Sequence, residues 1–482
     1  MTQAHRAATP HAIDPRVFPP TARRGSSCGE LKLGGIRATA LTAEFGSPLY
    51  VVDEDAARAR AVEVRTALQA EAERIGTTAT VYYATKAFLC VEVARWMADE
   101  GLAIDVASGG ELAVALAAGV DPALIGFHGN NKSVPEIERA VAAGVGTIIL
   151  DSEFETERVA AAAAAAGIRQ RVRLRVNSGV HASTHDFLAT SHEDQKFGQP
   201  LAEAPRLLRE ILRHDNLDFV GLHCHIGSQI FATDGFRESA RRLLGAYPEL
   251  ARIAGRPIPE LNLGGGFGIA YTSAEADELP AIADIARELA DIVAETAAEV
   301  NVPLPKLAFE PGRAIIGQAG VTLYTVGTTK SVQLAGSDAA ADPADLGYAE
   351  RLYVSVDGGM SDNPRPALYG ADYQVRIANR ESAAAPALVR VVGKHCESGD
   401  IVVQRDEIPG DVRPGDTLAV AATGAYCWSL ASTYNYVPRP PVVAISGGSA
   451  RIIVRGDTEE ELLAKSVSDA PRFTPTTNGA TK

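Results

Sequence analysis

Residues that can carry acid–base or nucleophilic chemistry stand at the ends of short apolar runs in this chain. Lys86 is the first, because the apolar residues 81–84 precede it and a helical pattern follows. Later apolar runs end in the same way, and the whole set is Lys86, Asp105, His225, Gly264–Gly266 and Glu310. An amine, an imidazole, a carboxylate and a glycine turn that can cradle a phosphate together indicate a pyridoxal phosphate site.

Lys86 is the predicted attachment point of that cofactor. An amine at the end of a barrel strand can form a Schiff base with pyridoxal phosphate when its surroundings lower its pKa. A solvated lysine at a strand end is the commoner situation, so Lys86 alone would not support the prediction. Lys132 stands at another predicted strand end and is a rival.

Gly264–Gly266 follow the seventh predicted strand. Glycines let the backbone approach an anion and direct its amides at it. Phosphate sites of barrel enzymes lie after strands seven and eight, so this position favours phosphate binding over a merely flexible turn. The segment is not a Walker loop, because no Gly-Lys-Ser/Thr sequence follows.

His223 and His225 end the sixth predicted strand and share one of its faces, because residues i and i+2 of a strand point the same way. A metal-binding pair is one interpretation. No acid or cysteine cluster completes a ligand set at metal-site spacing, so no metal is predicted. An imidazole stacked on a flat cofactor suits His225 better, with Ser228 donating to the phosphate.

Glu310 and Arg313 close the eighth predicted strand. A carboxylate at Glu310 could keep a pyridine nitrogen protonated, which makes the ring the electron sink that loss of carbon dioxide requires. Arg313 could bind a substrate carboxylate in bidentate fashion. A structural Glu–Arg ion pair is the alternative.

The C-terminal part adds further polar residues at Arg365, Tyr369, Cys396, Glu397 and Tyr426. A cysteine beside a glutamate offers an acid and a recognition carboxylate side by side. In isolation, a buried structural cysteine would be the better interpretation of Cys396.

Strand-like and helix-like segments alternate through the first two thirds of the chain. Eight parallel strands are predicted at Thr80–Ala84, Ala103–Val106, Leu124–Phe127, Thr147–Leu150, Arg171–Val176, Asp218–His223, Glu260–Leu263 and Lys306–Glu310. The simplest fold is an α/β (β/α)8 TIM-like barrel, which gathers all the strand ends on one face. An open doubly wound sheet is the alternative.

Four regions are expected along the chain. They are a mobile N-terminal tail over 1–30, a discontinuous β domain of 31–54 with 313–470, a pyridoxal-phosphate-binding barrel over 55–312, and a disordered tail over 471–482. The β domain is predicted to be a β-sandwich or small β-barrel, with strands at Val321–Val326, Leu352–Val356, Ala387–Val392 and Thr417–Ala421. Residues 177–199 are predicted to form a functional loop, and 334–347 a surface loop.

Composition excludes several classes of protein. The chain has 482 residues and a formal net charge of -14, which argues against a nucleic-acid surface. Its five cysteines have no CxxC spacing, so neither a disulfide framework nor a structural zinc site is favoured. No signal peptide or transmembrane run stands out, and a reducing cytoplasm with no membrane partner is expected.

Taken together, the motifs resemble those of the meso-diaminopimelate decarboxylases, a family of barrel-type (fold type III) pyridoxal phosphate-dependent decarboxylases. The resemblance covers roughly residues 31–470. The motifs that carry it are residues 83–87, 223–229, 264–268, 310–313, 396–400 and 424–426. The chain departs from the pattern at Phe88, where many relatives have Asn, and at Ser178, where Pro is usual.

The resemblance implies a role for each residue. Lys86 would carry pyridoxal 5'-phosphate, His225 would stack on its ring and Glu310 would pair with its nitrogen, with Asp105 in support. The phosphate would be bound by Gly264, Gly265, Gly266, Ser228 and Tyr426. The distal carboxylate end of the substrate would be held by Arg313, Arg365 and Tyr369. Cys396 and Glu397 would reach into the pocket of a neighbouring subunit, so the active unit would be a homodimer with shared sites.

Two contrasts within the resemblance favour decarboxylation of meso-2,6-diaminopimelate to L-lysine. Racemases of this fold have an arginine where this chain has Glu310, which weakens the electron sink. Relatives that act on diamines have an acid where this chain has Gly370, whereas Arg365 suits a distal carboxylate. Cys396 or Lys86 would return the proton to Cα. A decarboxylase of another carboxylated diamino acid, or a non-catalytic pyridoxal phosphate-binding barrel, are the alternatives.

Overall fold

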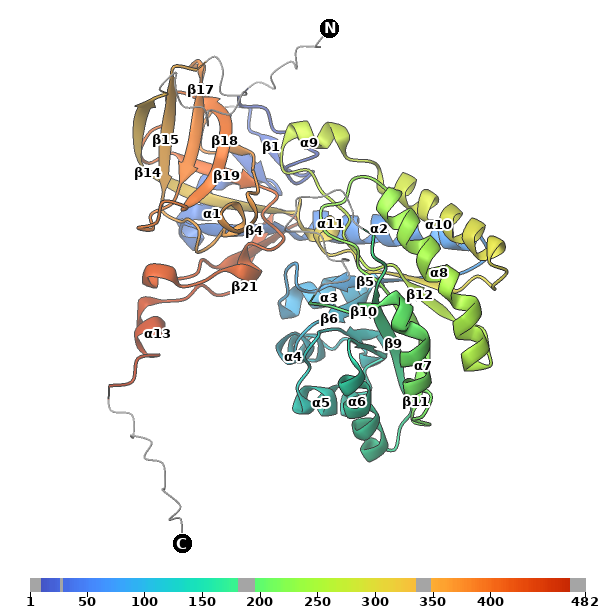
Figure 1. Ribbon diagram of the computed structural model, residues 1–482. Coiled ribbons are helices and arrows are strands. Elements are labelled where there is room, and N and C mark those ends of the chain that lie inside the picture. The colour runs from blue at the N-terminus through green and yellow to red at the C-terminus, as the bar shows by residue number, and fades with distance from the viewer. Residues whose placement is uncertain (1–9, 27–28, 181–195, 335–347, 469–482) are drawn as a thin grey trace.

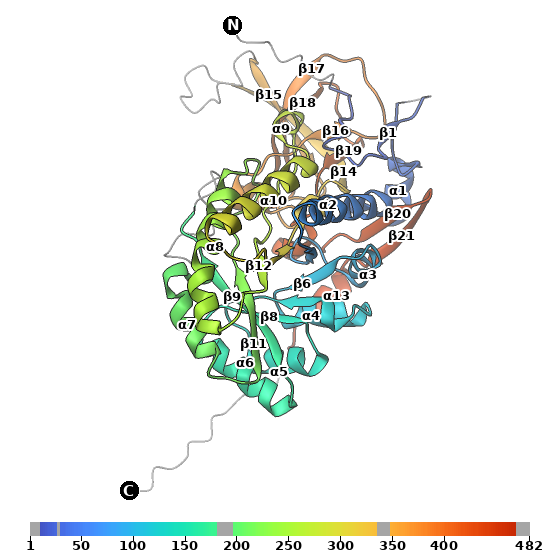
Figure 2. The same ribbon diagram turned by 90° about the vertical axis from the view of Figure 1, so that its right-hand side faces the viewer.

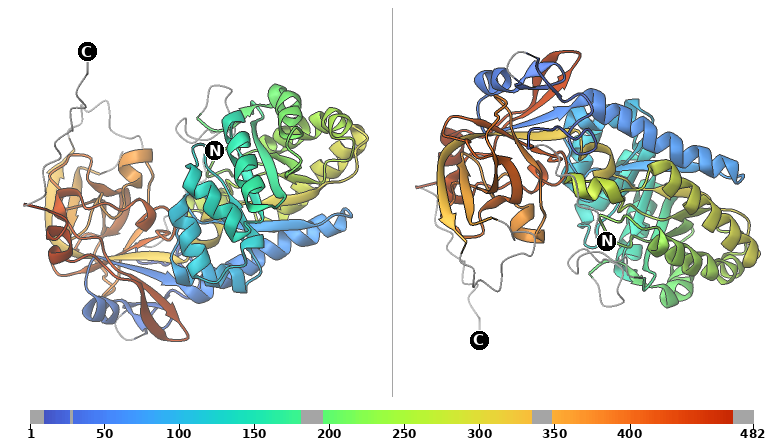
Figure 3. Two further views of the ribbon diagram at one scale, coloured as in Figure 1. Left: turned by 90° about the horizontal axis from the view of Figure 1, so that it is seen from below. Right: turned by 90° about the horizontal axis from the view of Figure 1, so that it is seen from above.

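The computed structural model describes residues 10–26, 29–180, 196–334 and 348–468. Two domains lie beside one another, a helix-covered barrel and a domain built mainly of strands (Figure 1). In the two views of Figure 3, the long helix α2 (Glu54–Arg74) leaves the β domain and runs along the barrel.

Eight parallel strands close into the barrel. They are β5 (Ala79–Ala84), β6 (Ala103–Val106), β7 (Ile125–Phe127), β8 (Thr147–Leu150), β9 (Gln170–Asn177), β11 (Leu217–His223), β12 (Glu260–Asn262) and β13 (Lys306–Phe309). Neighbouring strands pair in parallel, and β13 pairs with β5 to complete the ring. The (β/α)8 prediction is therefore confirmed, and the open sheet is excluded. A two-residue strand, β10 (Gln199–Pro200), pairs in parallel with the last two residues of β9, Val176 and Asn177.

Helices cover the outside of the barrel (Figure 2). Besides α2 they are α3 (Val91–Asp99), α4 (Gly109–Ala117), α5 (Val134–Ala143), α6 (Glu153–Ala166), α7 (Ala204–Ile211), α8 (Asp234–Ala254) and α10 (Ile282–Glu299). Polar residues set where some of these helices begin and end. Ser133 and Glu136 form the capping box that starts α5, and left-handed Gly144 ends it. The turn between β7 and α5 is thereby fixed behind the end of that strand.

The β domain contains strands from both ends of the chain. A sheet runs in the order β18–β17–β15–β14–β4–β20–β21, and β19 joins β14 to β16. The strands are β4 (Leu49–Asp53), β14 (Gly320–Gln333), β15 (Glu350–Val356), β16 (Val375–Ile377), β17 (Pro386–Val392), β18 (Ile401–Pro409), β19 (Thr417–Ala421), β20 (Val442–Ser446) and β21 (Ser449–Val454). Two helices follow its strands, α12 (Arg365–Tyr369) and α13 (Glu459–Leu463). Because β4 precedes α2, the chain enters the barrel from this sheet and returns to it through α11 (Arg313–Ile316).

The prediction of a mobile tail over 1–30 is wrong for residues 10–26. Val17 and Phe18 are fully buried in a cluster with side chains of the β domain. Strand β1 (Arg23–Arg24) pairs with β2 (Leu31–Leu33), which pairs with β3 (Ile36–Arg37) ahead of α1 (Ala38–Phe45). Two adjacent apolar residues suffice here because the β domain supplies the surface that covers them.

Several predicted segments lie outside the described residues. They are residues 1–9 of the N-terminal tail, 181–195 of the long loop, 335–347 of the surface loop and 469–482 at the C-terminus. Among the residues that are described, no helix combines the length and the apolar character needed to cross a lipid bilayer.

Candidate active site

A cavity of about 410 Å³ opens at the carboxyl ends of the barrel strands, where the β domain covers them. Its walls come from both domains, and include Lys86, Asp105, His128, Arg175, Phe197, His223, His225, Ser228, Glu310, Arg313, Arg365, Tyr369, Tyr426 and Leu430. A smaller recess beside it is lined in addition by Gly265 and Gly266. This volume suits a small-molecule ligand.

Lys86 extends into this cavity from the turn after β5. The preceding residue, Thr85, fixes the turn: its backbone N–H and its hydroxyl both donate to the carbonyl oxygen of Asp105, at 3.1 and 2.7 Å. The end of β5 is thereby tied to the end of β6, and the lysine and Asp105 face the same space.

Lys132 faces elsewhere. Its ammonium is buried and donates to the carbonyls of Gly129 and Ile149 and, at 2.8 Å, to the Glu155 carboxylate. Burial lowers the pKa of Lys132, although Glu155 partly offsets this. It does not line the cavity, so the rival for cofactor attachment is a structural residue.

The glycine turn after β12 is packed so closely that side chains are excluded. A Cβ on Gly264 would lie 2.6 Å from the Cys224 carbonyl oxygen, and one on Gly265 would lie 2.2 Å from that of Glu310. Gly264 also has a φ of +69°, which L side chains rarely adopt. The Gly265 N–H donates to Nδ1 of His225 at 3.2 Å, so the turn also orients the imidazole.

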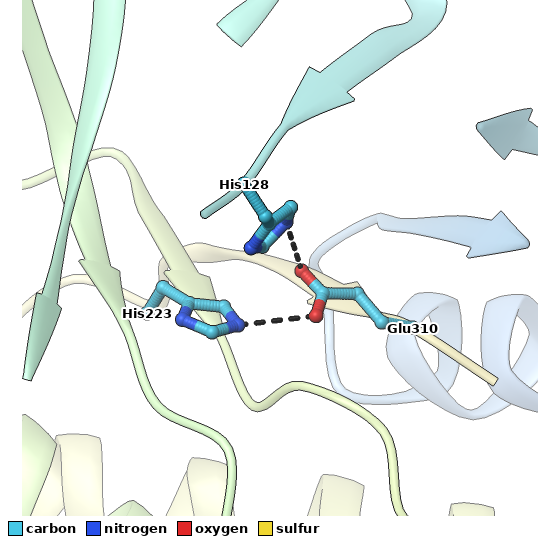
Figure 4. A group of neighbouring side chains, drawn as sticks. All are labelled: His128, His223 and Glu310. Atoms are coloured by element: carbon cyan, nitrogen blue, oxygen red, sulfur yellow. Dashed lines mark hydrogen bonds and ion pairs between the residues drawn. The ribbon is translucent and has the colours of Figure 1, made fainter. Parts of the chain in front are cut away.

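Glu310 is held by three donors on three other strand ends. His128 Nε2 and Asn262 Nδ2 lie 3.1 and 2.6 Å from its Oε1. His223 Nε2 lies 3.1 Å from its Oε2. Figure 4 shows the two imidazoles on either side of the carboxylate. Both oxygens of the carboxylate are thus contacted by side chains from other strand ends.

These contacts decide the charge of Glu310. Burial raises the pKa of a carboxyl group, but the two histidines and their hydrogen bonds bring the pKa of Glu310 well below its usual range. Burial also lowers the pKa of His128, and that of His223 to about 4. Neutral imidazole N–H groups therefore donate to an ionised carboxylate at neutral pH.

Asp105 behaves in the opposite way. Burial and the nearby negative charge of Glu310 raise its pKa well above the usual value, although Lys86 lowers it. Its Oδ1 lies 3.4 Å from His128 Nε2. Burial and the positive charges of Lys86 and Arg175 lower the pKa of His225 well below 6.5, so that ring is neutral.

The sequence missed His128, and its argument against an acid near the histidine pair is wrong. His128 comes directly after β7, the same strand-end position that singled out Lys86 and Asp105. Glu310, which follows β13, lies against His223 and His128. The ring nitrogens and the carboxylate oxygen that could bind a metal lie within 4.8 Å of one another. Arg175 and Phe197 were also missed; the Arg175 guanidinium lies 4.6 Å from the Phe197 ring centre.

Two arginines, Arg313 and Arg365, form another part of the cavity wall. Arg313 Nη2 donates to the Ser228 hydroxyl at 2.9 Å, and its guanidinium lies 4.6 Å from the Tyr426 ring centre. Arg365, at the start of α12, has its guanidinium 4.4 Å from the ring centre of Tyr271, another residue that the sequence did not single out. Tyr369, at the end of the same helix, is exposed at the cavity mouth.

Cys396 and Glu397 are not brought to the cavity of their own chain. Both are exposed on the β domain, beside buried His395, whose ring nitrogens contact Asn435 and Ser361. The remaining residues predicted for the site all line the cavity or the recess beside it, apart from Gly264, which holds the turn in place.

This set of residues fits pyridoxal phosphate. An amine, a neutral imidazole and an ionised carboxylate face one cavity, and a glycine turn that accepts no side chain borders the recess beside them. These are the groups that can attach the cofactor, cover its ring, protonate its nitrogen and hold its phosphate.

Comparisons with known proteins agree with the geometry. Residues 61–317 match the model of the pyridoxal binding domain of pyridoxal-dependent decarboxylases. The chain is 49% identical to the diaminopimelate decarboxylase of Mycobacterium tuberculosis over 461 residues, which cover 94% of this chain and 98% of that protein. It is 40% identical to that of Bacillus subtilis over 442 residues, covering 91% and 96%.

Solved structures show the same arrangement. The diaminopimelate decarboxylase from M. jannaschii, in complex with L-lysine, superposes with a TM-score of 0.81 at 30% identity and covers 93% of this chain and 98% of its own. The enzyme from Helicobacter pylori, also with L-lysine, gives a TM-score of 0.77 at 26% identity, covering 89% and 98%.

Barrel, cavity and matched domain together define a pyridoxal phosphate-dependent decarboxylase of the barrel type. Among these enzymes, the chain belongs to the diaminopimelate decarboxylase family. The barrel is its pyridoxal phosphate-binding domain.

Proposed function

We propose that this protein decarboxylates meso-2,6-diaminopimelate to L-lysine and carbon dioxide, the last step of lysine biosynthesis. One observation carries the proposal: Lys86 and an ionised Glu310 face the same cavity as two buried arginines. The names and the extent of the relatives support the same activity.

Bound pyridoxal phosphate supplies an electron sink for the electron pair that carbon dioxide leaves behind. Lys86 would attach the cofactor, and the Glu310 carboxylate would accept a hydrogen bond from its ring nitrogen. His225 would cover a flat face of the ring, and Asp105 would support the cofactor from the end of β6. Gly264–Gly266, Ser228 and Tyr426 would hold the phosphate.

The substrate is recognised by its second carboxylate. Arg313 and Arg365 are 7% and 5% exposed, and guanidinium groups suit bidentate binding of a carboxylate. Tyr369 at the cavity mouth adds a hydroxyl. Diaminopimelate keeps a carboxylate at the end that does not react, whereas a simple diamine has none.

The active unit is a homodimer with shared sites. Cys396 and Glu397 are exposed and absent from the lining of their own cavity, which supports insertion into the cavity of a second copy. Leu430, an exposed apolar side chain that lines the cavity, supports an interface there. Either Lys86 or the partner's Cys396 returns the proton to Cα. The four cysteines among the described residues are unpaired, in keeping with a reducing cytoplasm.

The activity is tested by carbon dioxide release from a panel of diamino acids, with meso-diaminopimelate expected to give the highest kcat/KM. Lys86→Ala should abolish both turnover and the visible absorbance of the bound cofactor. Lys306→Ala, at the opposite end of the barrel, is the matched control and should retain both. Preferred turnover of another diamino acid would reject the proposed substrate.

The shared site is tested by mixing Lys86→Ala with Cys396→Ala/Glu397→Ala, since each change should remove groups that a complete site requires. Subunits that exchange at random place one intact site in each mixed dimer, so activity should return to about a quarter of the wild-type value when half the dimers are mixed. Mixtures that stay inactive after verified subunit exchange would reject the shared site.

A further inference from the structure

We infer that Tyr271 is a positioning residue that sets Arg313 and Arg365 side by side as a two-point receptor for a substrate carboxylate. The inference rests on the proposed function, and it adds the residue that contacts both arginines and holds them next to each other. Tyr271 follows the glycine turn after β12 and is 3% exposed.

One tyrosine contacts both guanidinium groups in different ways. The Arg313 Nη1 donates to the Tyr271 hydroxyl. Arg365 instead lies over the ring face, with its Cζ 4.4 Å from the ring centre. The hydroxyl thus serves one arginine while the π face serves the other.

The partners of the two arginines leave their charge uncompensated. Within the described residues, neither Arg313 nor Arg365 forms a salt bridge, and their contacts are with tyrosine rings and hydroxyl groups. An aromatic face attracts a cation without cancelling its charge. Two like charges in a poorly solvated wall repel each other, so an anion between them is favoured.

Arg313 also retains an unused donor. Its Nε is buried and has no hydrogen-bond partner among the described residues. A buried guanidinium N–H without an acceptor is unfavourable, and an incoming carboxylate would satisfy it. This donor is a second indication, independent of the tyrosine contacts, that the wall is completed by an anionic ligand.

Tyr271 is itself held by both domains. Its backbone N–H donates to the Glu275 carboxylate at 2.6 Å, on α9 (Ser273–Glu278) of the barrel. Its carbonyl accepts from the N–H of Gln374 at 3.1 Å, from the β domain. Tyr373 packs edge-on against its ring at 5.1 Å and accepts a 2.5 Å hydrogen bond from Arg365. The spacing of the two cations therefore depends on the junction of barrel and β domain.

Substitutions separate the two contacts. Tyr271→Phe removes the hydroxyl from Arg313 and keeps the ring beneath Arg365, whereas Tyr271→Leu removes both. Tyr373→Phe removes only the hydroxyl bound to Arg365. Tyr353→Phe is the matched control, because Tyr353 contacts Arg390 in the same manner on β15, away from the cavity.

The readouts are kcat and KM for meso-diaminopimelate, and the inhibition constants of L-lysine and of 1,5-diaminopentane, which lacks the carboxylate. Tyr271→Phe should raise KM about 10-fold with kcat nearly unchanged, as expected for one hydrogen bond to a charged group. Tyr271→Leu should raise KM about 100-fold, since the cation–π contact is lost as well. Both substitutions should weaken the binding of L-lysine and leave the inhibition constant of 1,5-diaminopentane unchanged. Tyr353→Phe should match the wild type.

Two results would overturn the inference. One is a Tyr271→Leu enzyme that keeps the wild-type preference for L-lysine over 1,5-diaminopentane. The other is an equal loss of binding of both ligands in Tyr271→Phe, which would indicate a general structural role. Failure of the proposed function would give a different result from failure of this inference. In that case the wild type does not turn over diaminopimelate, whereas the ratio of the two inhibition constants still measures the carboxylate receptor.

Discussion

Two buried carboxyl groups, one in each domain, have pKa values that are shifted in opposite directions. Glu310 ends barrel strand β13, and Asp362 precedes α12 in the β domain; they are 7% and 1% exposed. Burial raises the pKa of both groups. Nevertheless, the pKa of Glu310 lies well below 4.5, whereas that of Asp362 is raised to about 7.

The kind of partner accounts for the difference. Glu310 is surrounded by two imidazoles and an amide that can only stabilise its anion. Asp362 accepts from the Tyr324 hydroxyl and the Gly359 N–H, but the negative charges of Asp400 and Asp357 raise its pKa further. A buried acid is thus kept ionised where the fold surrounds it with donors, and at Glu310 the raised pKa falls on the neighbouring Asp105 instead. The barrel does this at the site of chemistry.

Replacement of the two acids by their amides should separate these roles most strongly. Glu310→Gln should lower kcat about 10³-fold, because a preorganised charge at the reacting centre is lost. Asp362→Asn should leave kcat within about 3-fold, since Asp362 lies outside the cavity and an amide resembles a carboxyl group in shape and polarity. Steady-state decarboxylation of meso-diaminopimelate measures both. Equal losses in the two variants would contradict the contrast between the domains.

The sequence was sufficient to predict the parts that depend on local pattern. Each barrel strand lies within one residue of its expected bounds, because short apolar runs end sharply at polar residues such as Lys86 and Asp105. In a barrel these strand ends lie on one face, so most of the residues that line the cavity could be predicted from the sequence.

The missing parts depend on contacts between distant segments. His128 follows a strand of only three residues, and its partner Glu310 lies on another strand. Tyr271 is defined by a neighbour in the β domain, which no local periodicity reveals. Val17 and Phe18 were assigned to a mobile tail because the surface that buries them is supplied by residues far along the chain.

Removal of one histidine tests how the barrel keeps Glu310 charged. His128→Leu or His223→Leu should lower kcat/KM about 10-fold and move the acid limb of its pH profile upward, since a carboxylate that loses a hydrogen-bond donor has a higher pKa. The double variant His128→Leu/His223→Leu should shift the acid limb further upward. His214→Leu, in the turn after α7, is the control and should retain the wild-type profile. A uniform loss of activity with an unmoved acid limb would mean that the histidines only support the fold.

The smallest expected effect concerns the pH dependence of stability, where the two regions have opposite signs. The pKa of His223 falls from 6.5 to about 4 on folding, so the unfolded chain binds more protons between these values, and stability rises with pH there. The pKa of Asp362 rises from 3.8 to about 7, so the folded chain binds more protons, and stability falls as pH increases through that range.

Difference curves of apparent melting temperature should therefore slope in opposite directions. Between pH 5 and 6.5, the free energy of unfolding of the His223→Leu variant should fall relative to that of the wild type by about 1–2 kcal/mol as pH rises. Between pH 5 and 8, Asp362→Asn should gain about 2–3 kcal/mol, because the amide never has to ionise inside the β domain. Calorimetry of the holoenzyme at matched cofactor concentration measures both slopes. Parallel slopes would mean that partners other than burial and local donors control these two groups, and the contrast between barrel and β domain would fail.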